Sequence, residues 1–394
     1  MSWSTVRLGD LMPKRIPSVD PSKYPDEVFE LWSIPAFDAG TPEVVAGSEI
    51  GSSKKCVEPN DVLLSRIVPH IRRSWIVGPL NGHRQIASGE WITFRSERTH
   101  PAYLRHLLIS DFFHAQFMQT VAGVGGSLLR ARPEGVKQIE IPLPPLTEQQ
   151  RIAAILDAAD ALRAKRRAAL AKLDTLAQSI FIEMFGDPLT NEAGFEVVQL
   201  GELCDVRDGT HDSPKYVDDG FPLLTSKNFS SGEINFEGAK RISAKDYEAI
   251  NRRSKVDVGD IVMPMIGTIG SPVIIREEPN FAIKNVALIK FVGDDVTQEF
   301  VKELLSGPLL DRVVNRSGRG GTQKFVALGD LRSMEVPLPQ VEQQRKFSDR
   351  IEKIQQLRLS MTRSATALDD MFTSLQHRAF RGELTSVDEK VVAA

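Results

Sequence analysis

Two long segments of this 394-residue chain carry apolar residues at heptad spacing. In residues 147–187 the apolar positions follow one another at steps of three and four for about four heptads, with Arg166 as the one interruption. Residues 341–384 repeat this pattern. A helix of roughly 40 residues extends over roughly 55 to 60 Å, because each residue adds about 1.5 Å. Helices of this length with one apolar stripe need a partner, so we expect the two segments to pair as a coiled coil.

The same short motif opens both helices. Residues 141–151 read Ile-Pro-Leu-Pro-Pro-Leu-Thr-Glu-Gln-Gln-Arg, and residues 336–345 read Val-Pro-Leu-Pro-Gln-Val-Glu-Gln-Gln-Arg. In the first copy we expect Thr147 to cap the helix and Gln150 to complete a capping box, with two prolines preventing an extension upstream.

Further matched blocks follow in the same order in both halves of the chain. Their members lie 192 to 199 positions apart, and they are residues 6–11 with 198–203, 57–64 with 256–263, 103–108 with 300–305, and 125–127 with 320–322. A chance recurrence of turn residues would explain one such pair but not an ordered set. Between the blocks the copies diverge, which is typical of two domains that share a scaffold and differ in their surface loops.

The repeat predicts an α+β protein in which two similar mixed α/β domains are joined by two long antiparallel helices as a pseudo-two-fold internal repeat. The helices must run antiparallel if a two-fold axis crosses them. The expected segments are a first domain at 1–146, a central helix at 147–187, a second domain at 188–340, a C-terminal helix at 341–384 and a flexible tail at 385–394. The helices act either as a spacer between the domains or only as packing elements.

Composition narrows the cellular setting and the class of partner. Hydrophobic residues make up 41% and charged residues 26% of the chain, as in proteins that fold. Cys56 and Cys204 stand far apart without a CxxC spacing, which favours a reducing compartment and disfavours a zinc ribbon. With no signal-peptide pattern and no apolar run of about 20 residues, we expect a cytoplasmic location and no membrane contact. The net charge of −3 disfavours a free-standing nucleic-acid binder and leaves room for a partner that supplies positive charge.

Motifs that build catalytic sites are missing from the sequence. It contains no GxxxxGK(S/T) loop, no HExxH helix and no GxSxG elbow. The Asn/Asp-Pro-Pro-aromatic tetrapeptide that usually grips adenine in amino-methyltransferases is missing too. His211, Asp212 and Ser213 have the residue types of a hydrolase triad, but adjacent residues do not by themselves create its geometry. We therefore expect no catalytic residue, no metal site and no cofactor in this chain.

Several loops combine basic, amide and hydroxyl side chains with glycine. Such side chains can neutralise phosphates, and the donors of Arg, Lys, Asn and Gln match the edges of guanine and adenine. In the first domain the candidate DNA-binding residues are Lys54, Lys55, Ser65, Arg66, His70, Arg72, Arg73, Ser127, Arg130 and Arg132. In the second domain they are Thr210, His211, Lys215, Lys227, Asn228, Thr268, Arg319, Thr322, Gln323 and Lys324. A solvated surface role is equally open for each, and the basic residues Arg163, Lys165, Arg166 and Arg167 are expected to face a partner or solvent.

Over nearly its whole length, to about residue 384, the sequence resembles the specificity (S, HsdS) subunits of type I restriction-modification systems. The resemblance rests on the two motifs that open the helices and on residues 183–188, 208–216 and 375–384. It implies two target recognition domains, each reading one half of a bipartite DNA site, and helices that bind two methyltransferase (M) subunits. It also implies restriction (R) subunits, with S-adenosylmethionine, ATP and Mg used by these partners. The loop at 65–73 departs from the Gly-Thr-Ile-Gly form of residues 267–270, so roles do not transfer simply between the domains.

Three hypotheses follow for the function. The leading one is a non-catalytic specificity subunit that binds double-stranded DNA and positions methyltransferase and restriction subunits. The alternative is a non-enzymatic scaffold whose two domains bind proteins and are held apart by a coiled coil. The third is a hydrolase that uses His211.

Overall fold

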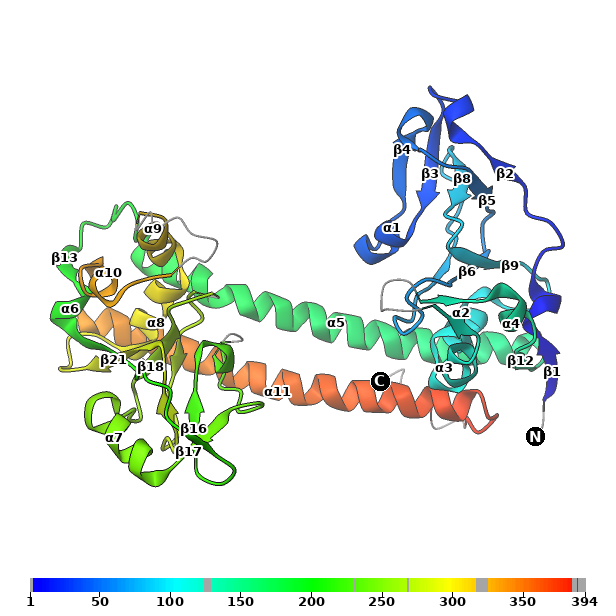
Figure 1. Cartoon of the computed structure of the whole chain (residues 1–394). Helices are drawn as coiled ribbons and strands as arrows, with labels where there is room; N and C mark the ends of the chain where they lie inside the picture. The colour runs from blue at the N-terminus through cyan, green and yellow to red at the C-terminus, as the bar shows by residue number, and fades with distance from the viewer. Residues whose placement is uncertain are drawn as a thin grey trace. The chain divides into compact units, whose positions relative to one another are not determined.

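The computed structural model describes residues 3–123, 129–229, 232–267, 269–316, 325–384 and 388 (Figure 1). The chain divides into two compact units, one formed by residues 1–167 and 363–394 and the other by residues 168–362. Each unit contains one α/β domain and a part of both long helices. Each domain is therefore packed together with segments of both helices in one compact unit.

The first domain combines small sheets with short helices. Its larger sheet has the strand order β2-β5-β8-β3-β4 and a second sheet has the order β7-β6-β9, while β1 pairs with β12 and β10 with β11. Strand pairs in both sheets are antiparallel except for β3 and β8. The strands are β1 (Ser4–Arg7), β2 (Ser18–Val19), β3 (Val28–Trp32), β4 (Glu43–Ala46), β5 (Lys54–Cys56), β6 (Val62–Ser65), β7 (Ser74–Ile76), β8 (Arg84–Ala87), β9 (Trp91–Phe94), β10 (Val121–Ala122), β11 (Arg130–Ala131) and β12 (Glu140–Leu143).

The helices of the first domain are α1 (Ile34–Ala39), α2 (Pro101–Ile109), α3 (Asp111–Met118) and α4 (Pro133–Lys137), and two of them start at a serine cap. The Ser33 hydroxyl accepts the backbone N–H of Ala36 at the start of α1, and the Ser110 hydroxyl serves α3 in the same way. Helix α1 ends at Gly40, whose φ of 82° suits a residue without a side chain.

The second domain repeats this mixture of sheets and helices. One sheet has the order β14-β21-β18-β19, a second has β15-β17-β16-β20, and β13 pairs with β22. The strands are β13 (Glu196–Gln199), β14 (Cys204–Asp208), β15 (Tyr216–Val217), β16 (Phe221–Leu224), β17 (Lys240–Ile242), β18 (Ile261–Pro264), β19 (Val273–Ile274), β20 (Ala282–Ile283), β21 (Val286–Phe291) and β22 (Glu335–Leu338). The helices are α6 (Leu200–Leu203), α7 (Ala244–Ser254), α8 (Gln298–Ser306), α9 (Pro308–Arg316) and α10 (Leu328–Arg332).

Strand pairing confirms that the sequence repeat is a structural repeat. In the first domain β1 runs antiparallel to β12 with Ser4 opposite Leu143, and in the second β13 runs antiparallel to β22 with Glu196 opposite Leu338. Directly after each first strand, a leucine N–H donates to a carbonyl near the end of the same domain. These bonds, from Leu8 to Ile139 and from Leu200 to Met334, both measure 2.9 Å. Each domain is thus closed by pairing its two ends.

The two long helices are α5 (Leu146–Phe185) and α11 (Val341–Ala379), and both extend through both units. In the unit with the first domain, Ile152 and Leu156 of α5 share one apolar core with Phe372 and Leu375 of α11. In the same unit Arg163 binds Asp369 at 2.6 Å. The early part of α5 therefore packs against the late part of α11.

The same antiparallel pairing continues in the unit with the second domain. There Phe181 and Phe185 pack against Phe347, with ring centroids 5.6 Å apart in both pairs. Arg358 binds Asp174 at 3.3 Å. The predicted pairing of the two helices is confirmed by these contacts. None of the helices that the structure describes is both long and apolar enough to cross a membrane.

Two expectations about the helices are wrong. Helix α5 begins at Leu146, and the Pro145 carbonyl accepts the N–H groups of Glu148 and Gln149. Thr147 therefore lies inside the first turn and is not its cap. Arg163 does not face an outside partner or solvent, because its side chain is 17% exposed and is bound by Asp369. The flexible tail predicted at 385–394 lies outside the described residues apart from Asp388, which pairs with Arg378 at 2.7 Å.

Candidate nucleic-acid interface

In the first domain, the loop after β6 lies beside the segment that follows the Gly-Gly-Ser sequence. The Ala131 N–H donates to the Arg66 carbonyl at 2.8 Å, and the Val68 N–H donates to the Leu129 carbonyl at 3.0 Å. The Glu90 carboxylate lies between two arginines, 3.4 Å from Arg66 and 3.2 Å from Arg130. The structure thus brings together two candidate cations that are far apart in the sequence.

Two candidates of this loop are held inside the domain. Arg73 is buried and makes two hydrogen bonds to the carboxylate of Asp38, at 2.7 and 2.8 Å. The Ser65 hydroxyl is buried as well and donates to the Ile67 carbonyl at 3.1 Å. These contacts fix the shape of the loop, and the geometry does not favour DNA contact by either side chain.

The remaining candidates of the first domain are half-buried or exposed. Burial lowers the pKa of Lys54, and burial together with the nearby Arg66 lowers that of Lys55. The Lys55 ammonium donates to the Trp91 carbonyl at 3.1 Å. His70, Arg72 and Arg132 are exposed, and Arg72 pairs with Asp111 at 2.6 Å. Ser127 lies outside the described residues.

In the second domain, one turn organises several of the predicted residues. Thr210 forms a bridge with Lys284, and the Asn285 N–H donates to the Thr210 carbonyl at 3.2 Å. The Asn285 carbonyl also accepts the Ser226 hydroxyl at 3.4 Å. The turn at 284–285 therefore holds the loop that carries His211 next to the short 3-10 turn Ser226–Asn228, which carries Lys227.

Two polar side chains near this turn, His211 and Asn228, have their ring nitrogens or amide atoms bonded within the domain. His211 places Nδ1 2.8 Å from the Asn285 side-chain oxygen and Nε2 2.6 Å from Asp208, so neither ring nitrogen is free for a ligand. Asn228 is buried, where its amide oxygen accepts the Thr225 N–H at 2.9 Å and its amide nitrogen donates to the Asn235 carbonyl at 2.8 Å. Asn228 therefore has a structural role.

Other candidates of the second domain are exposed or fall outside the described part. Lys215 and Lys227 are exposed. The candidates that lie outside the described residues are Thr268, Arg319, Thr322, Gln323 and Lys324. The structure does not support the hydrolase hypothesis, because none of the hydrogen bonds among the described residues joins His211 to Ser213. The Ser213 hydroxyl accepts a hydrogen bond from the Lys284 ammonium at 2.5 Å, and both His211 ring nitrogens are bonded to Asn285 and Asp208.

Both domains join their two loops in the same way. Ile67 forms a bridge with Arg130 in the first domain, and Ile266 forms one with Phe325 in the second. The backbone bond from Ala131 to Arg66 has its counterpart in the bond from Val326 to Met265, at 3.0 Å. In each domain the loop after the buried strand, β6 or β18, thus meets the segment that follows the glycine-rich sequence.

The family assignment agrees with this duplication. A family model described as the type I restriction modification DNA specificity domain matches residues 2–172 and again residues 192–366. This chain belongs to that family. The two matches fall on the two structural repeats, and they confirm the resemblance to specificity subunits.

Several curated relatives are named as specificity subunits of type I restriction enzymes. The specificity subunit of the type I restriction enzyme EcoBI of Escherichia coli is 26% identical over 278 residues, which cover 62% of this chain and 58% of that protein. The specificity subunit of MjaVIII from Methanocaldococcus jannaschii is 25% identical over 240 residues, 56% of each chain. The match therefore spans less than two thirds of the length of either relative.

Solved structures share the fold of this specificity-domain protein. A chain from a structure on complex assembly and conformational transition of the type I R-M system gives a TM-score of 0.63 at 23% identity, covering 97% of this chain and 98% of that one. The S subunit from M. genitalium gives 0.57 at 13% identity, covering 96% of both chains. At these identities the likeness concerns the fold.

The candidate interface of the second specificity domain also includes residues that were not among the predicted DNA-binding residues. Asp208 accepts hydrogen bonds from Arg253 and from His211, both at 2.6 Å. Lys284 and Asn285 form the turn described above. Arg253 lies 45 positions from Asp208, and Asn285 lies 74 positions from His211. No periodicity or motif connects residues at such separations, so folding alone reveals the cluster.

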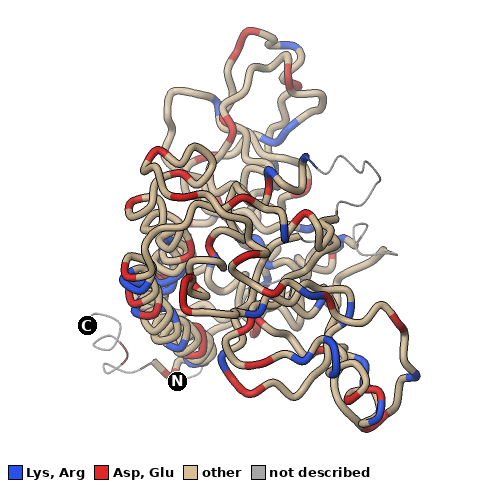
Figure 2. Tube along the Cα trace, turned by 90° about the vertical axis from the view of Figure 1, so that its left-hand side faces the viewer, with Lys and Arg blue, Asp and Glu red and all other residues tan. Residues whose placement is uncertain are grey.

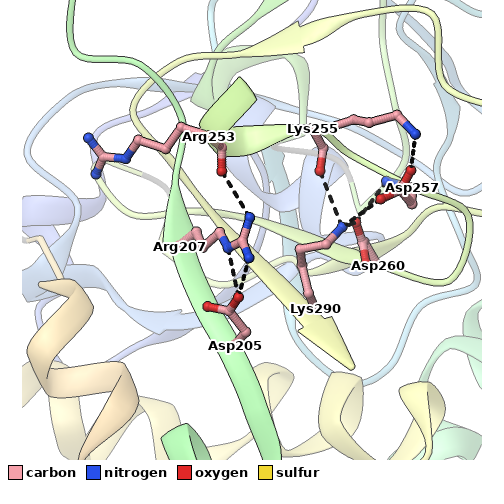
Figure 3. A network of polar contacts seen from close by, with 7 residues as sticks. All are labelled: Asp205, Arg207, Arg253, Lys255, Asp257, Asp260 and Lys290. Carbon is pink, nitrogen blue, oxygen red and sulfur yellow. Dashed lines mark hydrogen bonds and ion pairs between the residues drawn. The ribbon is translucent and has the colours of Figure 1, made fainter. Parts of the chain in front are cut away.

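Each specificity domain contains a buried carboxylate that is paired with a cation. Asp61 binds Arg95 at 2.6 Å and also accepts the Glu58 N–H. In the same way Asp260 binds Lys290 and accepts the Asp257 N–H at 2.7 Å (Figure 3). Burial raises the pKa of Asp260, and hydrogen bonds from Lys255 and Lys290 lower the pKa of Asp257. The Asp61–Arg95 and Asp260–Lys290 pairs therefore belong to the scaffold that the two domains share.

Basic and acidic residues are interspersed along the chain. Figure 2 shows positions of Lys and Arg among positions of Asp and Glu along the described Cα trace. This agrees with the net charge of −3 and with candidate cations that sit beside carboxylates such as Glu90 and Asp208. Among the residues that the structure describes, no group of three or more His, Cys, Asp or Glu side chains could hold a metal ion.

Proposed function

We propose that this chain is the DNA sequence-specificity subunit of a type I restriction-modification complex and that each domain reads one half of a bipartite site. The observation that carries the proposal is the duplication of the specificity domain, with shared strand registers and different loops. Two domains with one scaffold can hold two different recognition surfaces. The chain is expected to act without catalytic residues of its own and in the cytoplasm.

The DNA contacts are proposed for exposed side chains on the loops described above. In the first domain these are His70, Arg72 and Arg132, while the half-buried Arg66 and Arg130 pair with Glu90. In the second domain they are Lys215 and Lys227, which are exposed on the two segments that contact the turn at 284–285. Cations at such positions fix the register of a protein on the duplex through the phosphates, while base edges supply the sequence information.

Partner subunits complete the proposed activity. Two methyltransferase subunits would bind the helix pair, use S-adenosylmethionine and add positive charge around the DNA, while restriction subunits would use ATP and Mg. Since this chain carries a net charge of −3, its affinity for DNA without partners should be weak and salt-sensitive. The alternative, a scaffold whose domains bind proteins, predicts no sequence preference in any assembly.

Mapping of methylated adenines tests the proposal. The chain is co-expressed with its methyltransferase partner in a host that lacks other adenine methylation, and the modified positions are sequenced. We expect two fixed half-sites separated by a constant number of base pairs. Methylation without such a bipartite consensus would overturn the proposal. A gel-shift series with and without the methyltransferase checks the charge argument, which fails if this chain alone binds its site tightly at physiological salt.

A further inference from the structure

The last residue of strand β14, Asp208, is a buried anion with two partners. Its side chain is 7% exposed, one carboxylate oxygen accepts from Arg253 and the other from His211, and both distances are 2.6 Å. A buried carboxylate is costly unless hydrogen bonds satisfy it, so these two contacts are strongly favoured. Asp208 thereby fixes the direction of two side chains at the surface of the second domain.

The backbone of Arg253 is held as well. Arg207, which pairs with Asp205 on the same strand, donates to the Arg253 carbonyl at 3.1 Å (Figure 3). Lys290 of β21 donates to the Lys255 carbonyl at 3.2 Å. Both bonds place a cation at the carbonyl end of α7, where the helix dipole favours positive charge. The end of α7 is thus tied to the sheet β14-β21-β18-β19.

Arg253 nevertheless presents most of its guanidinium to solvent. The side chain is 73% exposed, and its ion pair with Asp208 uses a single nitrogen, Nη2. Figure 3 shows the side chain directed away from the Arg207 and Lys290 contacts. Arg73 in the first domain is the contrast, because its side chain is 10% exposed and binds Asp38 through two nitrogens. Arg253 is therefore fixed at one corner while the rest of its donor groups stays available.

We propose that Arg253 contacts a guanine edge in the half-site read by the second domain, with Asp208 and His211 as positioning residues. This inference rests on the proposed function. Arginine can donate two hydrogen bonds to O6 and N7 of guanine, and this contact requires a defined direction as well as charge. A guanidinium anchored by a buried carboxylate loses less conformational freedom when it binds. Lys215 and Lys227 are exposed on the two segments that contact the turn at 284–285, and their ammonium groups suit phosphate contacts.

The test uses the chain assembled with its methyltransferase partner and a duplex library randomised in the second half-site. The wild-type complex should select a G·C pair at one position. Arg253→Ala should lose roughly tenfold or more of the preference for that pair and keep the first half-site. Arg253→Lys retains the charge without the paired donors, so it should also lose the preference. Asp208→Asn should weaken the same preference, because the anchor is then uncharged.

Arg252→Ala is the matched control. Arg252 is an exposed arginine one position earlier on α7, so this variant removes the same charge and should keep the full preference. A uniform loss of affinity across all sequences in Arg253→Ala, with a smaller salt dependence, would mean a phosphate contact and would overturn the inference. An unchanged preference in Arg253→Ala would overturn it too. If the wild-type complex selects no bipartite site at all, the proposed function itself fails.

Discussion

The side-chain oxygen of Gln149 accepts the backbone N–H of His100 at 2.7 Å. The Gln149 side chain is completely buried, and its amide nitrogen donates to the carbonyls of Arg98 and Pro144. The first turn of α5 is thereby tied to the segment that precedes α2.

Gln344 makes the same three bonds in the second domain. It accepts the Thr297 N–H at 2.9 Å and donates to the carbonyls of Asp295 and Pro339, at 3.1 and 2.8 Å. In each copy of the repeated motif, one buried glutamine therefore joins a long helix to its own domain.

Loss of either glutamine should destabilise the domain that it joins to a helix. Gln149→Ala and Gln344→Ala each remove the side-chain partner of one backbone N–H and two backbone carbonyls at a buried position. A group of this kind costs about 1 to 3 kcal/mol when its hydrogen bond is lost. Urea unfolding followed by circular dichroism should show the change as a lower midpoint for the affected unit.

The neighbouring glutamines are matched controls for this experiment. Gln150 and Gln343 belong to the same motif but are exposed on their helices. Gln150→Ala and Gln343→Ala should shift the free energy of unfolding by less than about 0.5 kcal/mol. An equal loss of stability at the buried and the exposed positions would show that helix propensity explains the motif. The hydrogen bonds between helix and domain would then not be its reason.

The sequence could predict the features that periodicity and duplication encode. The heptad spacing predicted two long paired helices, and the ordered blocks predicted two similar domains. Aligning the letters Glu-Gln-Gln-Arg equates Gln149 with Gln343, whereas the hydrogen bonds equate Gln149 with Gln344. Only the fold corrects this register, because burial distinguishes two neighbouring glutamines that look alike in sequence.

The recognition surfaces were less accessible to prediction. Arg73 and Asn228 were predicted to bind DNA because of their residue types. Both side chains are buried and form hydrogen bonds within their own domain. Arg253 was missed, since nothing in sequence links it to Asp208. A basic residue looks the same in sequence whether it supports a loop or faces solvent, and only the position of its carboxylate partner separates the two roles.

The Arg163–Asp369 contact should contribute measurably to the helix pair. Arg163 binds Asp160 at 3.0 Å and Asp369 at 2.6 Å, and its guanidinium lies 4.2 Å from the ring centroid of Phe372. Arg163→Ala removes these contacts at a side chain that is 17% exposed, so we expect a loss of about 1 to 2 kcal/mol in the free energy of unfolding.

Arg167→Ala serves as the comparison for that variant. Arg167 also binds Asp369, at 2.9 Å, but its side chain is 58% exposed. Exposed ion pairs contribute between about 0 and 1 kcal/mol, so this variant should stay close to the wild type. Equal losses of stability in the two variants would contradict this explanation, in which burial and the contact with Phe372 make the contribution of Arg163 larger than that of Arg167.

Acid should remove the stabilisation that Asp157 gives to the first domain. Its carboxylate lies 2.7 Å from Nε2 of the buried His106, and this hydrogen bond lowers the pKa of Asp157 below its ordinary value of 3.8. A folded-state pKa below the unfolded value stabilises the fold above the unfolded pKa, and this contribution disappears as the pH falls through the folded value. The side chain is 52% exposed, so solvent screening keeps the effect below about 1 kcal/mol.

Unfolding of the wild type and of Asp157→Asn should be compared between neutral pH and about pH 2.5. The wild type should be more stable at neutral pH, and the difference should shrink below about pH 4. A difference that stays constant over the whole range would mean that the hydrogen bond with His106 does not depend on the charge of Asp157.

The spacer hypothesis predicts the outcome of lengthening both helices. Helix α5 passes from one compact unit to the other after Arg167, and α11 does so after Thr362. Four residues inserted at both points leave the contacts within each unit intact and add about 6 Å to each helix. At about 3.4 Å per base pair this corresponds to roughly two base pairs. The methylated half-sites should therefore stay the same while the gap between them grows.

The same insertion in the exposed turn at 80–82 should leave the gap unchanged. New half-sites at an unchanged gap in the lengthened chain would mean that the helices pack the domains without measuring the DNA.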